Sequence, residues 1–205
     1  MKASDLFVKC LETEGVTKIF GIPGEENADL MISLKKSKIE FILCRHEQAA
    51  AFMADVYGRL TGKAGVCLAT LGPGVTNLMT GLADANMDRA PVVAIIGQGS
   101  TERLHKESHQ IMDSISMVAP ISKWAQTILS AKNVTEVVRK AFKVAETEKP
   151  GVTVIELPED VAKEEVDQSP IKPSLIRRPA ADYRAINEAI DLIISAKNPI
   201  ILAGN

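Results

Sequence analysis

Aromatic residues and cysteines are both scarce in this chain of 205 residues. Phe, Trp and Tyr make up 4% of the sequence while 46% is hydrophobic, so the core is expected to consist of Val, Ile, Leu, Ala and Met. The three cysteines, Cys10, Cys44 and Cys67, are far apart and lack metal-ligand spacing. We interpret them as buried, reduced thiols, which favours an intracellular, cytoplasmic protein without a metal site of its own.

An excess of charge and a long apolar run are also lacking. The 24 basic and 26 acidic residues leave a net charge of −2, which excludes the basic surface typical of nucleic-acid or anionic-membrane binding. No apolar run approaches the roughly 20 residues of a membrane span. The alternation of apolar and charged residues from Ser4 onward is unlike a signal peptide. We therefore expect neither a nucleic-acid nor a membrane partner.

What the chain does have is a regular alternation of strand and helix patterns, repeated about six times over roughly its first 165 residues. This order predicts an α/β fold: a doubly wound, mostly parallel six-stranded sheet with helices on both faces. Ser4 is the expected N-cap of the first helix. The strands are expected at 16–20, 40–44, 64–70, 91–96, 121–128 and 152–157, with helices between them, including 46–60 and 132–148.

The alternation of strand and helix patterns ends after residue 165. Pro170, Pro173 and Pro179 lie in a polar segment, which predicts an extended linker over 166–182. A helix and a buried-type strand over 199–204 follow, and together they cannot bury their own apolar faces. We therefore expect a cofactor-binding domain over 1–165 and the start of a further domain over 183–205, in a piece of a longer chain.

Glycine turns follow three of the predicted strands, and in a parallel sheet such turns line the ligand crevice at the carboxyl ends. They are Gly21-Ile22-Pro23-Gly24, Gly72-Pro73-Gly74 and Gly97-Gln98-Gly99. A dinucleotide fingerprint is excluded in the second turn because Asn77 stands where the third glycine belongs, and no Walker A motif is present. One such turn is ordinary turn chemistry, but three on one rim favour a binding role.

Glu47 lies at this same rim, between an apolar strand pattern and the first turn of a helix. A first-turn glutamate can simply stabilise the helix dipole, which contributes about 0.3–1 kcal/mol. Alternatively, it is a working acid or base. Its helix has a face of small residues, Ala50, Ala51, Ala54 and Gly58, and larger residues face another way. We expect the small face to let a flat ligand or another backbone approach, with Glu47 partly shielded from water.

Other candidates for catalysis are weaker. His105 and His109 lie in a polar segment, where histidines are more often solvated than catalytic. No Ser-His-Asp or Cys-His arrangement and no zinc spacing is present. Gln110 and Asp113 flank Met112, and alone they are ordinary turn residues.

Taken together, several motifs in order resemble the thiamine-diphosphate enzymes of the acetolactate synthase type. The resemblance covers Met1 to about Glu165 and continues at 198–204. Its motifs are Phe20–Gly24, Arg45–Ala54, Gly62–Val66, Leu71–Asn77, Ala90–Val93 and His109–Asp113.

The resemblance implies the N-terminal pyrimidine-binding domain of a carboligase that decarboxylates pyruvate and joins the two-carbon unit to a second 2-oxo acid. Glu47 is then the catalytic residue, hydrogen-bonded to a ring nitrogen of the cofactor's aminopyrimidine. Gln110 matches a residue on the substrate side. The residues implied in cofactor binding are Gly21, Pro23, Gly24, Glu47, Thr70, Gly72, Pro73 and Asn77.

The resemblance also implies a homo-oligomer, a dimer or tetramer, with its active site between subunits, and Mg²⁺ held with the diphosphate by a domain absent from this chain. This chain alone is then expected to be inactive. FAD is possible in the family, but its site lies mainly outside these residues. The stretch His109–Asp113 is more similar to the catabolic or general form than to the biosynthetic form. Both acetoin and branched-chain amino acid metabolism therefore remain open. The alternatives are a related 2-oxo-acid decarboxylase and a non-catalytic interaction module of the same fold.

Overall fold

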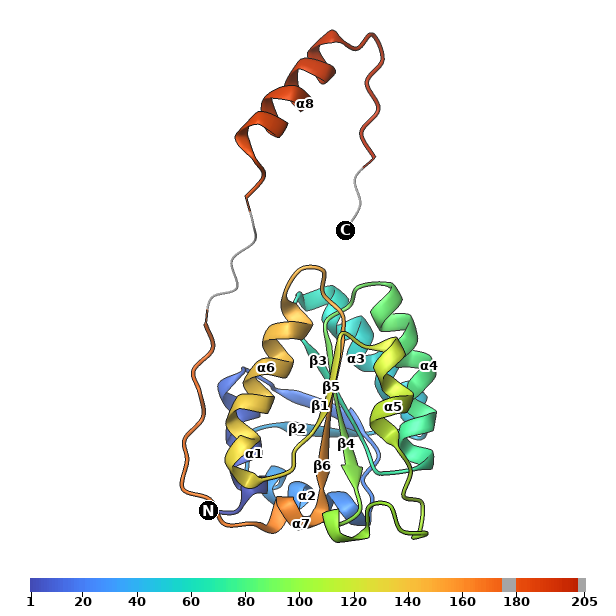
Figure 1. Ribbon diagram of the computed structural model, residues 1–205, viewed down its shortest axis with the longest axis vertical. Helices are drawn as coiled ribbons and strands as arrows, with labels where there is room; N and C mark the ends of the chain where they lie inside the picture. The colour runs from blue at the N-terminus through green and yellow to red at the C-terminus, as the bar shows by residue number, and fades with distance from the viewer. Residues whose placement is uncertain (175–179, 203–205) are drawn as a thin grey trace. The chain divides into compact units, whose positions relative to one another are not determined.

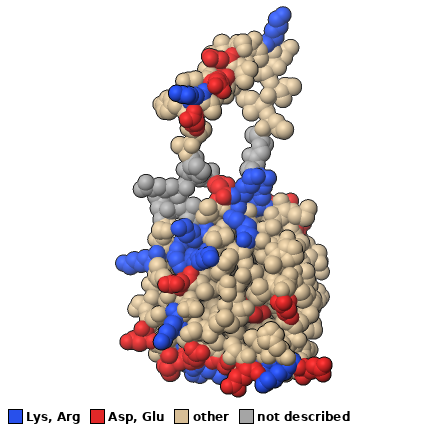
Figure 2. All heavy atoms as spheres, in the orientation of Figure 1, with Lys and Arg blue, Asp and Glu red and all other residues tan. Residues whose placement is uncertain are grey.

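The computed structural model describes residues 1–174 and 180–202. The chain divides into two compact units, Met1–Ser174 and Leu175–Asn205, and each is described by itself. Among the described residues, no helix is both long and apolar enough to cross a bilayer. On the face drawn in Figure 2, acidic and basic side chains of the larger unit are interspersed.

The larger unit is built on a parallel sheet of six strands, which confirms the predicted fold. The strand order is β2-β1-β3-β4-β6-β5. Every residue of β3, β4 and β6 is buried, because helices cover both faces of the sheet. The strands are β1 (Lys18–Gly21), β2 (Glu40–Leu43), β3 (Gly65–Ala69), β4 (Val92–Gln98), β5 (Trp124–Thr127) and β6 (Val152–Pro158).

Two helical layers enclose the sheet (Figure 1). Helices α1, α2, α6 and α7 bury their apolar residues in one core, and α3, α4 and α5 bury theirs in the other. The α-helices of this unit are α1 (Ala3–Thr13), α2 (Ala28–Leu34), α3 (Glu47–Thr61), α4 (Pro73–Met87), α5 (Ser114–Val118), α6 (Val134–Glu146) and α7 (Glu159–Lys163). The short 3₁₀ turns are η1 (Glu25–Asn27), η2 (Thr101–Arg103), η3 (Ala119–Ile121) and η4 (Ala131–Asn133).

The strand order places a topological switch point between β1 and β3. Within the sheet, β2 is the neighbour of β1 on one side and β3 is its neighbour on the other side. Loops that leave neighbouring strands in opposite directions open a crevice at the carboxyl ends of those strands. The loop after β1, the start of α3 and the start of α4 all lie at this edge.

The prediction that Ser4 caps the first helix is wrong. The N-cap is Lys2, which makes no side-chain capping bond, and the Ala3 N–H donates to the Glu164 carbonyl at 2.8 Å. Ser4 is the second residue of α1 and is fully buried. Its hydroxyl accepts a hydrogen bond from the Ser33 hydroxyl of α2 at 3.1 Å. The start of α1 is therefore satisfied by the end of the domain, a partner that lies far away in the sequence.

In the second unit, α8 (Tyr183–Ser195) is capped by Asp182, whose carboxylate accepts from the Arg184 N–H at 2.9 Å. The predicted strand over 199–204 is wrong for the residues that the structure describes, because 199–202 form no strand. The side chains of Ile200 and Leu202 are 93% and 97% exposed. Nothing among the described residues pairs with this segment, and a lone strand cannot satisfy its backbone. Residues 203–204 lie outside the described part of the chain.

Candidate functional site

Glu47 is the first residue of α3, directly after the turn that follows β2. The N-cap of α3 is His46, whose Nδ1 accepts a hydrogen bond from the Gln48 N–H at 3.1 Å. The half-buried carboxylate of Glu47 instead accepts a hydrogen bond at Oε2 from the side-chain amide of Asn77, on α4, at 3.0 Å. Glu47 keeps its place in the helix dipole, but its carboxylate is oriented by the neighbouring helix.

Glycines bring the backbone close to this carboxylate. A Cβ built on Gly74 would lie 3.3 Å from Thr70 Cγ2 and 3.7 Å from Glu47 Oε1. A Cβ on Gly24 would lie only 2.4 Å from Thr70 Cβ, so no other residue fits there without displacement. Thr70 therefore links the loop after β1 to the start of α4, with Glu47 beside it. A side chain in place of either glycine would fill space on this rim.

Gln110 lies against the second glycine turn. Gly72 has a φ of +56°, and a Cβ on it would come within 2.7 Å of the Gln110 carbonyl oxygen. Gln110 itself has a φ of +55° and is exposed to solvent. The backbone of the segment that carries Gln110 thus lies directly on the turn that begins α4, although the two are far apart in the sequence.

Three of the predicted binding residues, Gly21, Pro23 and Pro73, have no described contact with Glu47. Gly21 is buried at the end of β1, where a Cβ would lie 2.4 Å from the Leu68 carbonyl oxygen, so close strand packing explains this glycine. Pro23 is exposed in the loop after β1, and Pro73 is exposed at the first position of α4. The structure thus brings together Glu47 and Asn77 with Gly74, Thr70 and Gly24, and separately Gly72 with Gln110.

Of the two alternatives for the small-residue face of α3, the close approach of another backbone is confirmed, and the approach of a flat ligand along this face is not. Ala50, Ala51, Ala54 and Gly58 are buried inside the domain. A Cβ on Gly81 of α4 would lie 2.6 Å from Ala51 Cβ, and one on Gly65 of β3 would lie 2.0 Å from the Ala54 carbonyl oxygen. The small residues therefore allow α3 to pack closely on α4 and on the sheet. Glu47, at the start of the helix, lies outside this packed face.

Two residues at the rim were not singled out from the sequence. The Thr70 hydroxyl donates to Glu26 Oε2 at 2.8 Å. Asn27 is 2% exposed, and its Oδ1 has no hydrogen-bond partner. A buried acceptor without a donor is costly, so this atom is suited to a polar group that the chain itself does not supply. No local pattern distinguishes either residue from ordinary loop positions.

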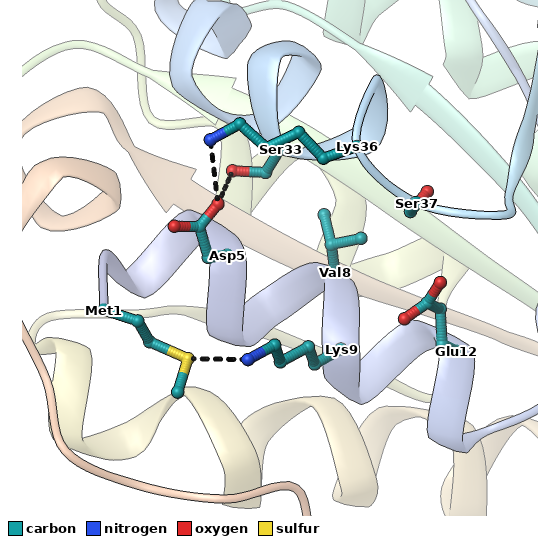
Figure 3. A pocket seen from close by; sticks show the side chains of 8 residues that line it. All are labelled: Met1, Asp5, Val8, Lys9, Glu12, Ser33, Lys36 and Ser37. Carbon is teal, nitrogen blue, oxygen red and sulfur yellow. Dashed lines mark hydrogen bonds and ion pairs between the residues drawn. The ribbon is translucent and has the colours of Figure 1, made fainter.

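A pocket of about 250 Å³ lies elsewhere, between α1 and α2 (Figure 3). Within it, the Asp5 carboxylate accepts from the Ser33 hydroxyl at 2.8 Å and faces Lys36. These helices cover the opposite face of the sheet from α3 and α4, and the pocket shares no residue with the rim. Its lining residues are Met1, Asp5, Val8, Lys9, Glu12, Ser33, Lys36 and Ser37.

A doubly wound parallel sheet with a carboxylate–amide pair and close-lying glycines at its carboxyl-end rim defines a ligand-binding α/β domain. Residues 1–117 match the family model of the thiamine pyrophosphate enzyme N-terminal TPP binding domain, and the chain belongs to this family.

Its relatives include acetolactate synthases from bacteria and archaea. It is 42% identical over 204 residues to the catabolic acetolactate synthase of Raoultella terrigena, covering 98% of this chain and 36% of that protein. It is 41% identical over 215 residues to a probable acetolactate synthase large subunit of Methanococcus aeolicus, covering 100% of this chain and 35% of that protein. A glyoxylate carboligase of Escherichia coli O157:H7 is 38% identical over 208 residues, covering 100% of this chain and 35% of that protein. The chain thus spans about a third of the length of these relatives.

The residues at the rim fit the pyrimidine half of thiamine diphosphate. A carboxyl group can share a proton with a ring nitrogen, and Glu47 places one beside Gly74, which has no side chain of its own to occupy the rim. The unpaired Asn27 Oδ1 offers an acceptor at the same edge of the sheet. Among residues 1–174 and 180–202, no cluster of His, Cys, Asp or Glu side chains suited to a metal ion occurs.

Proposed function

We propose that this chain is the pyrimidine-binding part of a carboligase that decarboxylates pyruvate and joins the two-carbon unit to a second 2-oxo acid. The observation that carries the proposal is the Glu47–Asn77 pair at the switch point of the sheet. The names of the acetolactate synthase relatives support the reaction class. The domain division into 1–165, a linker over 166–182 and the start of a further domain over 183–205 belongs to the same proposal.

Thiamine diphosphate, when bound, would supply a thiazolium carbon that is acidic enough to lose its proton and serve as a nucleophile toward a 2-oxo acid. Glu47 is the residue of this chain that would exchange a proton with the pyrimidine ring nitrogen, through its carboxyl group. Asn77 holds Oε2 at 3.0 Å, so the carboxyl group keeps one orientation. A fixed orientation matters because proton transfer requires the two heavy atoms to be within hydrogen-bond distance.

The other residues at the rim shape the space that the cofactor ring would occupy. Gly24 and Gly74 keep side chains away from the ring face, and Thr70 links the two loops that carry them. Gly72 and Pro73 form the turn on which the segment of Gln110 lies, so we place Gln110 on the substrate side. Gly21 acts indirectly, by letting β1 approach β3 at the base of the site.

An exposed apolar stripe on α3 supports an oligomer with the active site between subunits. Met53, Val56 and Leu60 are 44%, 51% and 81% exposed, and they recur at helical spacing on the helix that begins with Glu47. A surface of this kind beside a functional group is typical of a protein interface. Mg²⁺ and the diphosphate would then be held by residues outside this chain. A cytoplasmic location is supported by the three buried free cysteines.

The test is the formation of acetolactate from pyruvate by the full-length protein that carries this chain, with and without thiamine diphosphate and Mg²⁺. Glu47→Gln should lower kcat/KM about 10²–10⁴-fold, the range for loss of a general acid or base. The matched control is Glu136→Gln, because Glu136 is also a first-turn glutamate, but it lies on α6 on the other face of the sheet. This control should retain wild-type activity. Activity of Glu47→Gln close to wild type would remove Glu47 from the mechanism.

A carboligase acting on glyoxylate is the second candidate, because glyoxylate carboligase aligns over 100% of this chain. Supplying pyruvate and glyoxylate separately and identifying the products decides between the two. Release of the free aldehyde without carbon–carbon bond formation would instead identify a 2-oxo-acid decarboxylase. No cofactor-dependent turnover of any 2-oxo acid would leave only a non-catalytic interaction module.

A further inference from the structure

A polar pair is buried toward the carboxyl ends of two neighbouring strands. Gln98 is the last residue of β4 and Glu156 lies on the neighbouring strand β6, and they are 2% and 4% exposed. Gln98 Nε2 donates to Glu156 Oε1 at 3.0 Å, and Glu156 Oε2 accepts from the Thr127 hydroxyl of β5 at 2.6 Å. Burying a carboxylate in this way costs stability unless hydrogen bonds compensate. Hydrogen bonds from Gln98 and Thr127 supply that compensation here.

The pair also holds the segment that carries Gln110. The same Gln98 Nε2 donates to the Met112 carbonyl at 3.2 Å, and the Gln98 Oε1 accepts from the Gly99 N–H at 3.0 Å. The side-chain amide thus fixes both ends of the segment from Gly99 to Met112. Met112 is two residues beyond Gln110, whose backbone lies on Gly72. A displacement of Met112 would therefore move Gln110 relative to the rim.

The start of the segment is hydrogen-bonded to α7, the helix that directly follows β6. The Ser100 and Thr101 N–H groups donate to the carboxylates of Glu159 and Asp160 on α7, at 3.3 Å and 3.0 Å. The Arg103 guanidinium donates to Glu159 Oε1 at 3.2 Å. Carboxylates of α7 thus accept hydrogen bonds at the start of the segment, and Gln98 contacts the Met112 carbonyl at its end.

Burial raises the pKa of Glu156 above its usual range, while hydrogen bonds from Thr127, Gln98 and Ser114 oppose the rise. The other charged group that acts on it is the carboxylate of Asp113, at the N-cap of α5. Asp113 is exposed, so it adds to the rise without sharing the buried site.

We propose that Gln98 and Glu156 are positioning residues that hold the segment 99–112 so that Gln110 faces the substrate. The proposal rests on the proposed function for its substrate, a 2-oxo acid, but the order of the segment can be measured without turnover. Neither residue touches the substrate: both act through Met112 and Gln110.

The central experiment compares Gln98→Met with Glu156→Gln in the full-length protein. Methionine keeps the length of the side chain but removes both donors, and kcat/KM for pyruvate should fall about 10- to 100-fold, as expected when a positioned group is displaced by about 1 Å. The affinity for thiamine diphosphate should not change, because Glu47 and Asn77 are untouched. Glu156→Gln should cause a smaller loss than Gln98→Met, since a carboxamide can still accept from Gln98 and donate to Thr127.

A double-mutant cycle tests whether Gln98 acts through Gln110. Gln110→Asn shortens the side chain and tolerates the positive φ of this position. If Gln98 positions Gln110, then Gln98→Met should cause little further loss in the Gln110→Asn background. Full additivity of the two losses would overturn the proposal. Should Gln98→Met fail to fold, Thr127→Val removes one donor to Glu156 and should give a smaller loss of the same kind.

Amide hydrogen exchange of the 205-residue chain gives a readout that is independent of activity. Gln98→Met should speed exchange within 100–112 and leave α6 unchanged. Unchanged exchange in this segment would overturn the positioning role even if the protein were active. Conversely, an inactive wild-type protein whose segment loosens in Gln98→Met would refute the proposed function and support the positioning role.

Discussion

Replacing Gly81 by Ala tests the close packing of α3 on α4 that holds the Glu47–Asn77 pair. Asn77 and Gly81 are four residues apart, so they lie on the same face of α4. A methyl group on Gly81 would lie 2.6 Å from Ala51 Cβ and 3.2 Å from the Phe52 backbone nitrogen. One helix must therefore move if the methyl group is added.

The magnitude follows from two opposing effects. In an exposed helix, Gly→Ala stabilises by roughly 1 kcal/mol, whereas overpacking a well-packed site destabilises by about 1–3 kcal/mol. The free energy of unfolding of Gly81→Ala should therefore be between unchanged and about 2 kcal/mol lower than wild type. The assay is urea unfolding of the 205-residue chain, with the slope of the transition checked for constancy.

The matched double variant removes the methyl group of Ala51 on α3 and adds one at Gly81 on α4. Ala51→Gly removes the nearest atom, so the double variant Ala51→Gly, Gly81→Ala should be more stable than the sum of the single changes by about 0.5–3 kcal/mol. A Gly81→Ala protein that is stabilised by about 1 kcal/mol, as at an exposed site, would refute the reasoning. Strict additivity of the two substitutions would refute it as well.

Three further predictions concern buried and paired groups. Because burial raises the pKa of Glu156, the folded protein binds this proton more tightly than the unfolded chain. Wild-type stability relative to Glu156→Gln should therefore fall as pH rises from the usual glutamate range, and a pH-independent difference in urea unfolding would contradict this. The pKa of Cys67 and of Cys10 is raised to about 12 by burial, so both thiols should resist iodoacetamide at pH 8 until urea unfolds the chain, whereas rapid labelling of the native protein would exclude this account. Arg59 is bonded to the buried Asp55 at 2.7 Å, and Arg59→Met should destabilise by about 1–3 kcal/mol by leaving that carboxylate poorly paired, an effect that a thermal melt would show as a lower Tm.

The parallel sheet could be predicted from the sequence because its central strands are covered on both faces. A segment such as Val92–Gln98 is almost entirely apolar, and this pattern needs no knowledge of its neighbours. The placement of Glu47 was predictable for a related reason: a strand that stops at a charged residue and a helix that begins there put that residue at the carboxyl edge. Both inferences depend on local pattern alone.

The parts that could not be predicted depend on contacts between distant residues. Gln98 and Glu156 are separated by 58 positions, and nothing in either strand marks them as partners. The small residues of α3 left two alternatives open because periodicity shows that a face is small, but not whether a helix or a ligand packs on it. Ser4 was misassigned for the same reason, since the end of the domain satisfies the first amide of α1.

The most direct test of the role of Glu47 is the rate at which the thiazolium C2 proton of bound thiamine diphosphate exchanges with deuterium in the full-length protein. This rate, followed by proton NMR after rapid acid quench, reports on proton transfer without requiring turnover of a substrate. Glu47→Gln should slow the exchange by about 10²–10⁴-fold, while Glu136→Gln should exchange at the wild-type rate. Exchange at the wild-type rate in Glu47→Gln with the cofactor bound would contradict the account.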